Sequence, residues 1–291
     1  MAQDKPARPP YPADLTDAQW TILAPLMPAA HTPRGGRPRD VDMRDMVQTR
    51  LSLKRSGCQG AMLPHDWRPK SLVDDDCARW RDEGTWAKLL TALREQTRRH
   101  AGREPTPRAA GLDSQSVKTT EMGGAERGDD GGKKVNGRQR PVVVATLGLL
   151  RALVSTGAGL DDGVAAPPLL QQIDPHDCPR LETIVADHTY HQHVLHAWMA
   201  AHRPAWRIAV KRRPEGSKGF TPLENRWVVE RTNAWHGRYR RHSKDDERKP
   251  ASSAAMIYLP NIHLMLRRRT SHPRPAFHYR NVAAEPLKLA S

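Results

Sequence analysis

Between residues 109 and 269, runs typical of strands and runs with helical periodicity follow one another in a definite order, which limits the fold more than any other feature. The order is strand, hairpin, helix, strand, helix, strand, helix, and then one last helix. Alternation of this kind predicts an α/β domain with helices packed on a sheet. The strands are expected at 109–117, 142–144, 152–154, 183–187 and 206–210, and the helices around 169–173 and at 190–200, 225–235 and 251–269.

The N-terminal third has helical patterns throughout. Thr16 and Gln19 have the spacing of a capping box, and helical spacing continues at 41–54 and 85–98. Ser71 is expected to cap a shorter helix. About four helices with short connections and scattered arginines suit a helix-turn-helix-like DNA-binding unit, although helical bundles without that function have the same pattern.

Pro105 and Pro107 mark the point where the composition changes, and we place a domain boundary there. Within the helical part, Arg37 and Arg39 lie in an Arg-Gly-Arg-Pro context similar to arms that enter the minor groove, but a plain turn has the same composition. The predicted organisation is a disordered leader at 1–14, a helical domain at 15–102, an α/β catalytic domain at 108–269 and a disordered tail at 270–291.

The balance of charge indicates the kind of partner. Lys and Arg number 47 against 32 acidic residues, which gives a formal net charge of +15. A strongly basic protein binds a polyanion, and the sequence contains neither an apolar run of the ~18 residues needed for a membrane span nor a hydrophobic signal segment. We therefore expect a cytoplasmic nucleic-acid-binding protein without a membrane partner or a small-molecule substrate. Three widely spaced cysteines suggest neither a disulfide framework nor a zinc knuckle.

Three acidic residues stand in unusual surroundings. Asp113 lies in the middle of a predicted strand, and Asp187 ends a short apolar strand. Glu230 lies on a helix whose apolar stripe (Val228, Thr232) faces away from it. A single Glu on a helix is usually a solvated charge. The two aspartates, however, occupy positions where a carboxylate without a chemical role is costly.

If these three carboxylates meet, their mutual repulsion requires a neutralising cation. A ligand set made only of oxygen atoms favours Mg²⁺ or Mn²⁺ over Zn²⁺. Two such ions can activate a water or a 3′-hydroxyl and stabilise the leaving oxygen at phosphorus. Acids of this kind on a basic protein therefore suggest phosphodiester chemistry on a polymer.

Several motifs together resemble one family, the DDE transposases of bacterial insertion sequences, and within it insertion-sequence family five of the family-four superfamily. The resemblance covers about residues 11–270. The segments that carry it are Asp113-Ser-Gln-Ser-Val-Lys-Thr-Thr120, Gly132-Lys-Lys-Val-Asn-Gly-Arg138, Ala186-Asp187, Arg226-Trp-Val-Val-Glu-Arg-Thr232, Ser243-Lys-Asp245 and Ile262-His-Leu-Met-Leu-Arg-Arg268, with Leu15-Thr-Asp-Ala-Gln-Trp20, Gly35-Gly-Arg-Pro-Arg39, Met62-Leu-Pro64 and Arg79-Trp-Arg-Asp82 in the helical part.

The resemblance implies a ribonuclease-H-like catalytic domain, a mixed sheet flanked by helices, with Asp113, Asp187 and Glu230 as catalytic residues and ligands of two Mg²⁺ or Mn²⁺ ions. It further implies cleavage at terminal inverted repeats, transfer of the 3′-OH ends into target DNA, a homodimer in the DNA complex and association with the bacterial nucleoid. The basic residues expected to contact DNA phosphates, besides Arg37 and Arg39, are Lys118, Lys133, Lys134, Arg226, Arg231, Arg238, Arg240, Arg241 and Lys244.

The chain also departs from the family. Related transposases often carry an Asp where this chain has Ala145 and a His where it has Pro141, and Gly60, Asp74 and Asp76 replace common aromatic residues. Two alternatives therefore stay open: a DNA-binding remnant that occupies the inverted repeats without cutting, and a metal-dependent nuclease without strand transfer. In the family's helix signature Gly237 stands where a basic residue is usual, so Arg238 or Lys244 would have to replace it.

Other clusters are interpreted as structural. His188, His191, His193 and His196 invite a zinc assignment, but no nearby Cys or acid is spaced to complete a tetrahedral set. The acidic pairs at 129–130 and 161–162 fall in Gly-containing loops. The acids at 74–76 are expected in the first turn of a helix, where negative charge favours the helix dipole.

Overall fold

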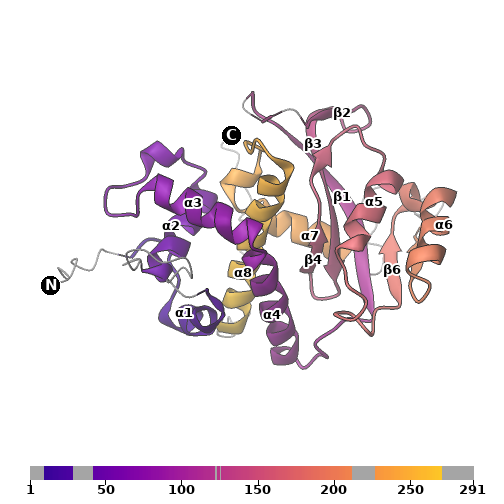
Figure 1. Cartoon of the computed structure of the whole chain (residues 1–291), viewed down its shortest axis with the longest axis horizontal. Helices are drawn as coiled ribbons and strands as arrows, with labels where there is room; N and C mark the ends of the chain where they lie inside the picture. Colours follow the sequence, from indigo (N-terminus) through magenta and orange to yellow (C-terminus); the bar gives the residue numbers. More distant parts are fainter. Residues whose placement is uncertain (1–9, 29–41, 122, 125, 212–226, 271–291) are drawn as a thin grey trace, which may run out of the picture.

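The protein is described from a computed structural model that covers residues 10–28, 42–121, 123–124, 126–211 and 227–270. Helices gather at one end of the molecule and a sheet with its own helices at the other (Figure 1). The helical end contains α1 (Asp17–Leu23), α2 (Met43–Ser56), α3 (Lys70–Asp82), α4 (Thr85–His100) and the last helix, α8 (Pro250–Thr270).

The sheet is mixed, and its order follows β2-β3-β1-β6-β7, with β4 and β5 also paired to β3. Strand β1 runs antiparallel to β3 and parallel to β6, and β6 runs parallel to β7. The strands are β1 (Ala109–Lys118), β2 (Gly128–Asp130), β3 (Val135–Ala145), β4 (Leu149–Leu153), β5 (Thr156–Gly157), β6 (Thr183–Ala186) and β7 (Arg207–Val210).

Each face of the sheet is covered by different helices. Helices α5 (Asp162–Gln171) and α6 (His193–His202) share a buried cluster with Leu112 and Val143. On the opposite face, α7 (Trp227–His236), α4 and α8 share a second cluster with Val142 and Val144. Side chains alternate between the faces of a strand, so neighbouring β3 valines enter different clusters.

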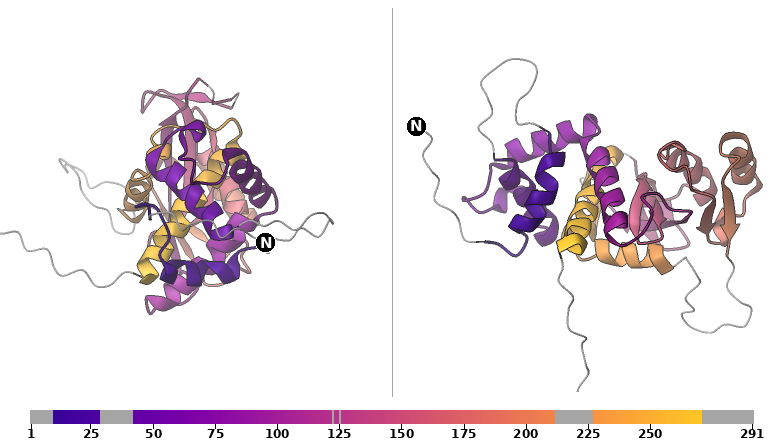
Figure 2. Two further views of the ribbon diagram at one scale, coloured as in Figure 1. Left: turned by 90° about the vertical axis from the view of Figure 1, so that its left-hand side faces the viewer. Right: turned by 90° about the horizontal axis from the view of Figure 1, so that it is seen from below.

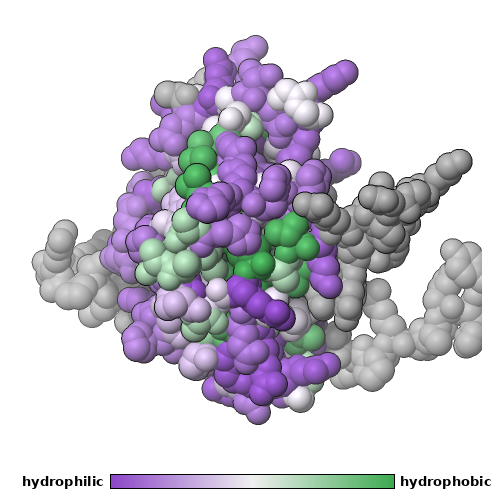
Figure 3. Space-filling view, turned by 90° about the vertical axis from the view of Figure 1, so that its right-hand side faces the viewer, coloured by the Kyte–Doolittle hydropathy of each residue, from purple (hydrophilic) through white to green (hydrophobic). Residues whose placement is uncertain are grey.

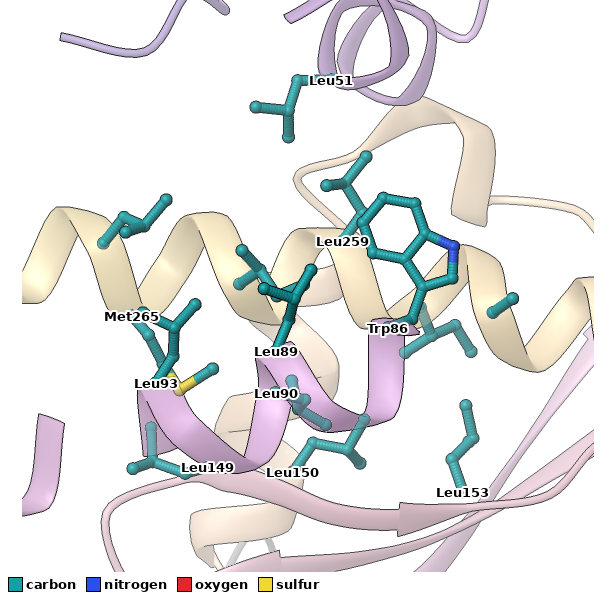
Figure 4. Packing of buried hydrophobic residues seen from close by; sticks show 14 of the residues in the cluster. Leu51, Trp86, Leu89, Leu90, Leu93, Leu149, Leu150, Leu153, Leu259 and Met265 are labelled. Atoms are coloured by element: carbon teal, nitrogen blue, oxygen red, sulfur yellow. The ribbon is translucent and has the colours of Figure 1, made fainter. Parts of the chain in front are cut away.

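The second cluster also joins the helical end to the sheet. Helix α4 inserts Trp86, Leu89 and Leu93 between α8 and strand β4 (Figure 4). Helix α8 contacts α1, α3 and α4 as well as β4, so the last helix of the chain completes the layer that the first four begin. The view from below shows α8 between the N-terminal helices and the sheet (Figure 2, right).

The prediction of an α/β domain preceded by a helical region is confirmed, with local corrections. Thr16 and Gln19 form the expected capping box. Ser71 does not cap α3, because that helix already begins at Lys70 after Pro69; the acids at 74–76 accordingly lie beyond its first turn. The acids at 129–130 lie in β2, not in a loop, and α5 and α6 begin at Asp162 and His193.

A buried ion cluster ties β3 to the segment before α8. Arg138 is fully buried; its guanidinium donates to an Asp245 carboxylate oxygen at 3.2 Å and to the carbonyls of Gly123, Glu126, Glu247 and Arg248. Arg140 contacts the second oxygen of Asp245 at 3.4 Å, and the Ser253 hydroxyl also donates to that carboxylate. Buried charges survive only when they are paired in this way.

We predict that Asp245→Ala lowers the free energy of unfolding by about 3–5 kcal/mol, because it leaves two buried guanidinium groups without their carboxylate. Urea unfolding followed by circular dichroism measures this change. The matched control is Asp246→Ala, whose carboxylate is partly exposed and pairs with Arg241, and we expect a loss of about 1 kcal/mol or less. Equal losses in the two variants would contradict the role of the cluster.

Candidate active site and nucleic-acid surface

Two of the predicted catalytic acids lie at matching positions of adjacent strands. In the parallel pairing of β1 with β6, Ala109 lies opposite Thr183 and Gly111 opposite Val185. Both pairs are separated by 74 residues, and the same offset relates Asp113 to Asp187. Strand β6 ends at Ala186, so Asp187 follows directly where the two strands run side by side.

Local hydrogen bonds orient both aspartates. The Ser114 backbone N–H donates to Asp113 Oδ1 at 2.7 Å. Asp187 caps the short 3₁₀ helix η3 (His188–Tyr190) and accepts from the Thr189 backbone N–H at 2.9 Å and from the Thr189 hydroxyl at 2.5 Å. Both carboxylates are only partly exposed, and each is held by the chain that follows it.

The buried phenol of Tyr190 lies near several acidic residues. Burial raises the pKa of its phenol well above the ordinary value, and the charges of Asp162, Asp113 and Asp187 raise it further. The Tyr190 hydroxyl donates to Asp162 Oδ1 at 3.4 Å, and Asp113 and Asp187 lie near enough for their charges to act on the same phenol.

Helix α7 carries Glu230 on the side of the sheet toward which Asp113 points. Asp113 pairs with Val142 in the antiparallel register of β1 and β3, and directly paired residues point to the same face. Val142 shares its cluster with Val228 and Val229 of α7, whereas Glu230 is exposed. The prediction that this helix buries Val228 and Thr232 and exposes Glu230 is confirmed. The helix contacts both β1 and β3.

The three acids are not gathered into a ready-made cage. Among the described residues, no group of three or more His, Cys, Asp or Glu side chains is arranged to hold a metal ion. The register relates Asp113 to Asp187, and Glu230 is placed on the same face of the sheet as Asp113. The triad stays a prediction. The donor chemistry itself, carboxylate oxygen only, fits a hard divalent cation.

The predicted DNA-binding arginines occupy varied surroundings. Arg37, Arg39 and Arg226 lie outside the described residues. The Arg231 guanidinium lies 4.2 Å from the ring centre of Trp227 and 4.7 Å from that of Trp235, a cation–π arrangement that fixes its direction.

Of the two adjacent arginines in the segment after α7, one is exposed and one is paired. Arg240 is exposed and lies in the 3₁₀ helix η4 (Arg240–His242). Arg241 is partly buried and pairs with Asp246 at 3.1 Å and with Glu247 at 3.3 Å. Arg241 is thus tied to its own segment.

Two sets of exposed basic side chains remain open to solvent. Lys118 and Lys134 line one shallow groove of about 460 Å³, and Lys133 nearby pairs with Asp130 at 3.4 Å. Arg238 lines a small pocket of about 50 Å³ beside Trp235, together with Arg267 of the 262–268 motif and Arg55, which no sequence motif singles out. Lys244 is exposed on the same segment.

The rest of the visible surface is strongly hydrophilic. Figure 3 shows the side of the molecule that carries α6, where hydrophobic residues form small patches among hydrophilic ones. Val164 and Val194 are among the exposed hydrophobic residues. Within the described ranges, the helices are too short or too polar to cross a bilayer.

Sequence reasoning misses two polar features of the site. The sequence pattern places Asp162 in a solvated loop, yet its carboxylate accepts hydrogen bonds from Gln139, Thr189 and Tyr190. The signal available is weak: Thr189 and Tyr190 lie two and three residues after Asp187, but Asp162 is remote in sequence. Arg138, part of a motif that carries the family resemblance, proves to be buried in the ion cluster with Asp245.

Comparison with known proteins agrees with this arrangement. Residues 104–266 match a family model described as "Transposase DDE domain", and residues 15–90 match one described as "Putative transposase of IS4/5 family". A Burkholderia cepacia protein described as "Putative transposase for insertion sequence element IS402" is 30% identical over 129 residues, which cover 42% of this chain and 60% of that relative. The alignment thus spans less than two thirds of the relative's length.

A mixed sheet with this order, covered by helices on both faces and carrying aspartates on two adjacent parallel strands, defines a ribonuclease-H-like catalytic fold. The DDE model covers more than half of the chain. The chain belongs to the DDE transposases, and specifically to the IS4/5 type found in bacterial insertion sequences.

Buried histidines fix α7 against α8. The Asn261 amide donates to His236 Nε2 at 2.9 Å, and His263 Nδ1 contacts the Tyr239 hydroxyl at 2.8 Å. Burial lowers the pKa of His236 and of His263 to about 4, and lowers that of His242 well below its ordinary value. These imidazoles are neutral in the folded protein at pH 7.

The free energy of unfolding should therefore decrease as the pH is lowered. As the pH drops from about 6.5 toward about 4, the unfolded chain binds protons at these histidines and the folded chain does not, so unfolding is favoured by up to about 3 kcal/mol per residue. We predict that His236→Gln, which retains an acceptor for Asn261, makes the pH dependence of the unfolding free energy shallower by up to about one proton in this range. Urea unfolding at several pH values measures the slope, and parallel curves would contradict the assignment.

Proposed function

We propose that this protein is an insertion-sequence transposase that cuts DNA at terminal inverted repeats and transfers the freed 3′-OH ends into target DNA. Asp113, Asp187 and Glu230 are the proposed catalytic and metal-binding residues. The observation that carries the proposal is the parallel pairing of β1 with β6, because the offset of 74 residues in that pairing also relates Asp113 in β1 to Asp187 just after β6. The family supports the reaction class, and this offset supports the choice of the two aspartates.

The proposed chemistry has two balanced steps. In cleavage, the oxygen of a water forms a bond to phosphorus while the bond to the 3′-oxygen breaks; the water's proton passes to that oxygen, and the products are a 3′-OH and a 5′-phosphate. In strand transfer, this 3′-OH attacks a phosphodiester of the target, whose own 3′-oxygen leaves. Each phosphoester bond broken in transfer is replaced by one formed, so no other co-substrate is needed.

Divalent cations, two Mg²⁺ or Mn²⁺ in our proposal, would stabilise the charge that develops at phosphorus. The chain's own part is to hold their ligands. The Ser114 backbone N–H orients Asp113, and Thr189 orients Asp187. Glu230 is carried on a helix packed against β1 and β3, and the hydroxyl of the buried Thr232 lies 2.9 Å from the Val228 carbonyl of that helix and 3.2 Å from the Gly148 carbonyl.

DNA would lie along the basic surfaces that flank the acids. Lys118 continues the strand that carries Asp113, and Lys134 shares its groove. Arg238 and Lys244 follow the helix that carries Glu230 and are exposed. Because such contacts release counterions, binding should weaken steeply with salt. A homodimer in the DNA complex is part of this proposal.

One observation favours the second candidate, a DNA-binding remnant. A cavity of about 350 Å³ lies among α2, α3 and α8, and both Gly60 and Asp74, which stand where relatives often carry aromatic residues, line it. Charged side chains line much of this partly open space, so the packing that an aromatic residue would supply is absent. Asp76, in contrast, is buried but pairs with Arg79 at 2.6 Å and is accommodated.

We predict that Asp187→Ala removes cleavage and retains inverted-repeat binding. The assay incubates protein and Mg²⁺ with a supercoiled plasmid that carries the flanking inverted repeats. Joined products from the wild-type chain support the transposase, nicks alone support a nuclease without strand transfer, and a gel shift without cleavage supports the remnant. Loss of both cleavage and binding in Asp187→Ala would contradict its catalytic role.

We further predict that Lys118→Gln combined with Lys134→Gln weakens DNA binding and reduces the slope of log K against log salt by about 1 for each phosphate that is no longer neutralised. The control is Arg108→Gln, just before the opposite end of β1, where the side chain is exposed and 4.0 Å from Glu182. Fluorescence anisotropy at several salt concentrations gives the slopes. An unchanged slope in the double variant would show that this groove does not contact DNA.

A further inference from the structure

Asp162 occupies a position that its role in a helix does not explain. It is the first residue of α5, but the helix is capped by its neighbour: the Asp161 carboxylate accepts from the Gly163 N–H at 2.8 Å. The Asp162 carboxylate instead accepts from the Gln139 amide at 2.5 Å, from the Thr189 hydroxyl at 3.0 Å and from the Tyr190 hydroxyl at 3.4 Å. Three donors from β3 and η3 thus converge on one acid outside the predicted triad.

The Thr189 contact leads directly to Asp187. The Thr189 hydroxyl lies within hydrogen-bond distance of both Asp162 Oδ2 and Asp187 Oδ1, and it has a single proton to donate. The Thr189 backbone N–H also donates to Asp187 Oδ1. When the hydroxyl donates to Asp162, the backbone N–H of Thr189 still donates to Asp187 and orients its carboxylate.

The Gln139 contact leads toward Asp113. The Gln139 amide donates to Ser114 Oγ at 3.0 Å as well as to Asp162, and the Ser114 backbone N–H donates to Asp113. Hydrogen bonds and the residue Ser114 therefore connect the two predicted metal ligands, with Asp162 at the centre. Acceptors that orient the ligands of a metal site in this way tune its affinity without touching the ion.

We propose that Asp162 is a positioning residue of the transposase site, which holds Asp187 through Thr189 and Asp113 through Gln139 and Ser114. This inference rests on the proposed function of the two aspartates. It assigns a role in metal affinity to a fourth carboxylate, on the face of the sheet opposite to Glu230.

The test uses the full chain and Mn²⁺ alone as the probe. Asp162→Asn retains the shape of the side chain but presents an amide N–H to a ring of donors. We expect Mn²⁺ affinity, measured by electron paramagnetic resonance or calorimetry, to fall about 10–100-fold. Cleavage of the inverted-repeat plasmid at low Mn²⁺ should fall with it and recover as Mn²⁺ is raised, which a merely folding-related defect would not do.

The neighbouring residues supply the controls. Asp161→Asn alters the helix cap but not the Thr189 contact, so Mn²⁺ affinity should be unchanged. Thr189→Ser retains the hydroxyl and should bind Mn²⁺ like the wild type, whereas Thr189→Val should resemble Asp162→Asn. Unchanged Mn²⁺ affinity in Asp162→Asn, or an equal loss in Asp161→Asn, would overturn the positioning role.

Failure of the proposed function gives a different result. If Asp113 and Asp187 are not the metal ligands, Asp187→Ala binds Mn²⁺ as the wild type does, whatever Asp162→Asn does. If Asp187→Ala loses Mn²⁺ and Asp162→Asn does not, only the positioning role is wrong.

Discussion

The parallel pairing of β1 with β6 is the interaction on which the site depends. A parallel register is held by backbone hydrogen bonds along both strands, and a slip of one residue would turn every side chain to the other face. Here the register is also enforced by burial, because Ala110 and Ile184, which are paired, enter the same apolar cluster. The offset of 74 residues that relates Asp113 to Asp187 is thus fixed by the packing of apolar side chains on both strands.

The site sits at the seam between two apolar clusters. Asp113 points to the face covered by α7 and α8, and Asp162 reaches it from the face covered by α5. Tyr190 is buried and donates to Asp162 at 3.4 Å. A partly buried carboxylate requires hydrogen-bond donors, and Gln139, Thr189 and Tyr190 supply them to Asp162.

Much of this arrangement could be predicted, and what could not has physical causes. Strands β1 and β6 and helices α4 and α8 have strong apolar periodicity, and their limits agree closely with the sequence patterns. Ser71 has the chemistry of a helix cap, but the chain enters that helix one residue earlier. Asp162 gives no signal because a carboxylate near glycine is ordinarily solvated, and only the tertiary fold brings Gln139 and Thr189 to it. The buried state of Arg138 likewise depends on Asp245, far along the chain.

Helix α8 has a bearing on how the chain is made. The first four helices emerge from the ribosome early, yet the apolar sides of α1, α3 and α4 pack on residues 250–270, near the end of the chain. At about 5–20 residues per second, synthesis of the chain between α4 and α8 takes roughly 10–30 seconds. During that interval the N-terminal helices lack α8, the helix against which their apolar sides pack in the folded protein. A product truncated by a frameshift before Pro250 would keep all the acids discussed above. It would nevertheless expose the apolar surface that α8 covers in the folded protein, and exposed surface of this kind is bound by chaperones and attacked by proteases.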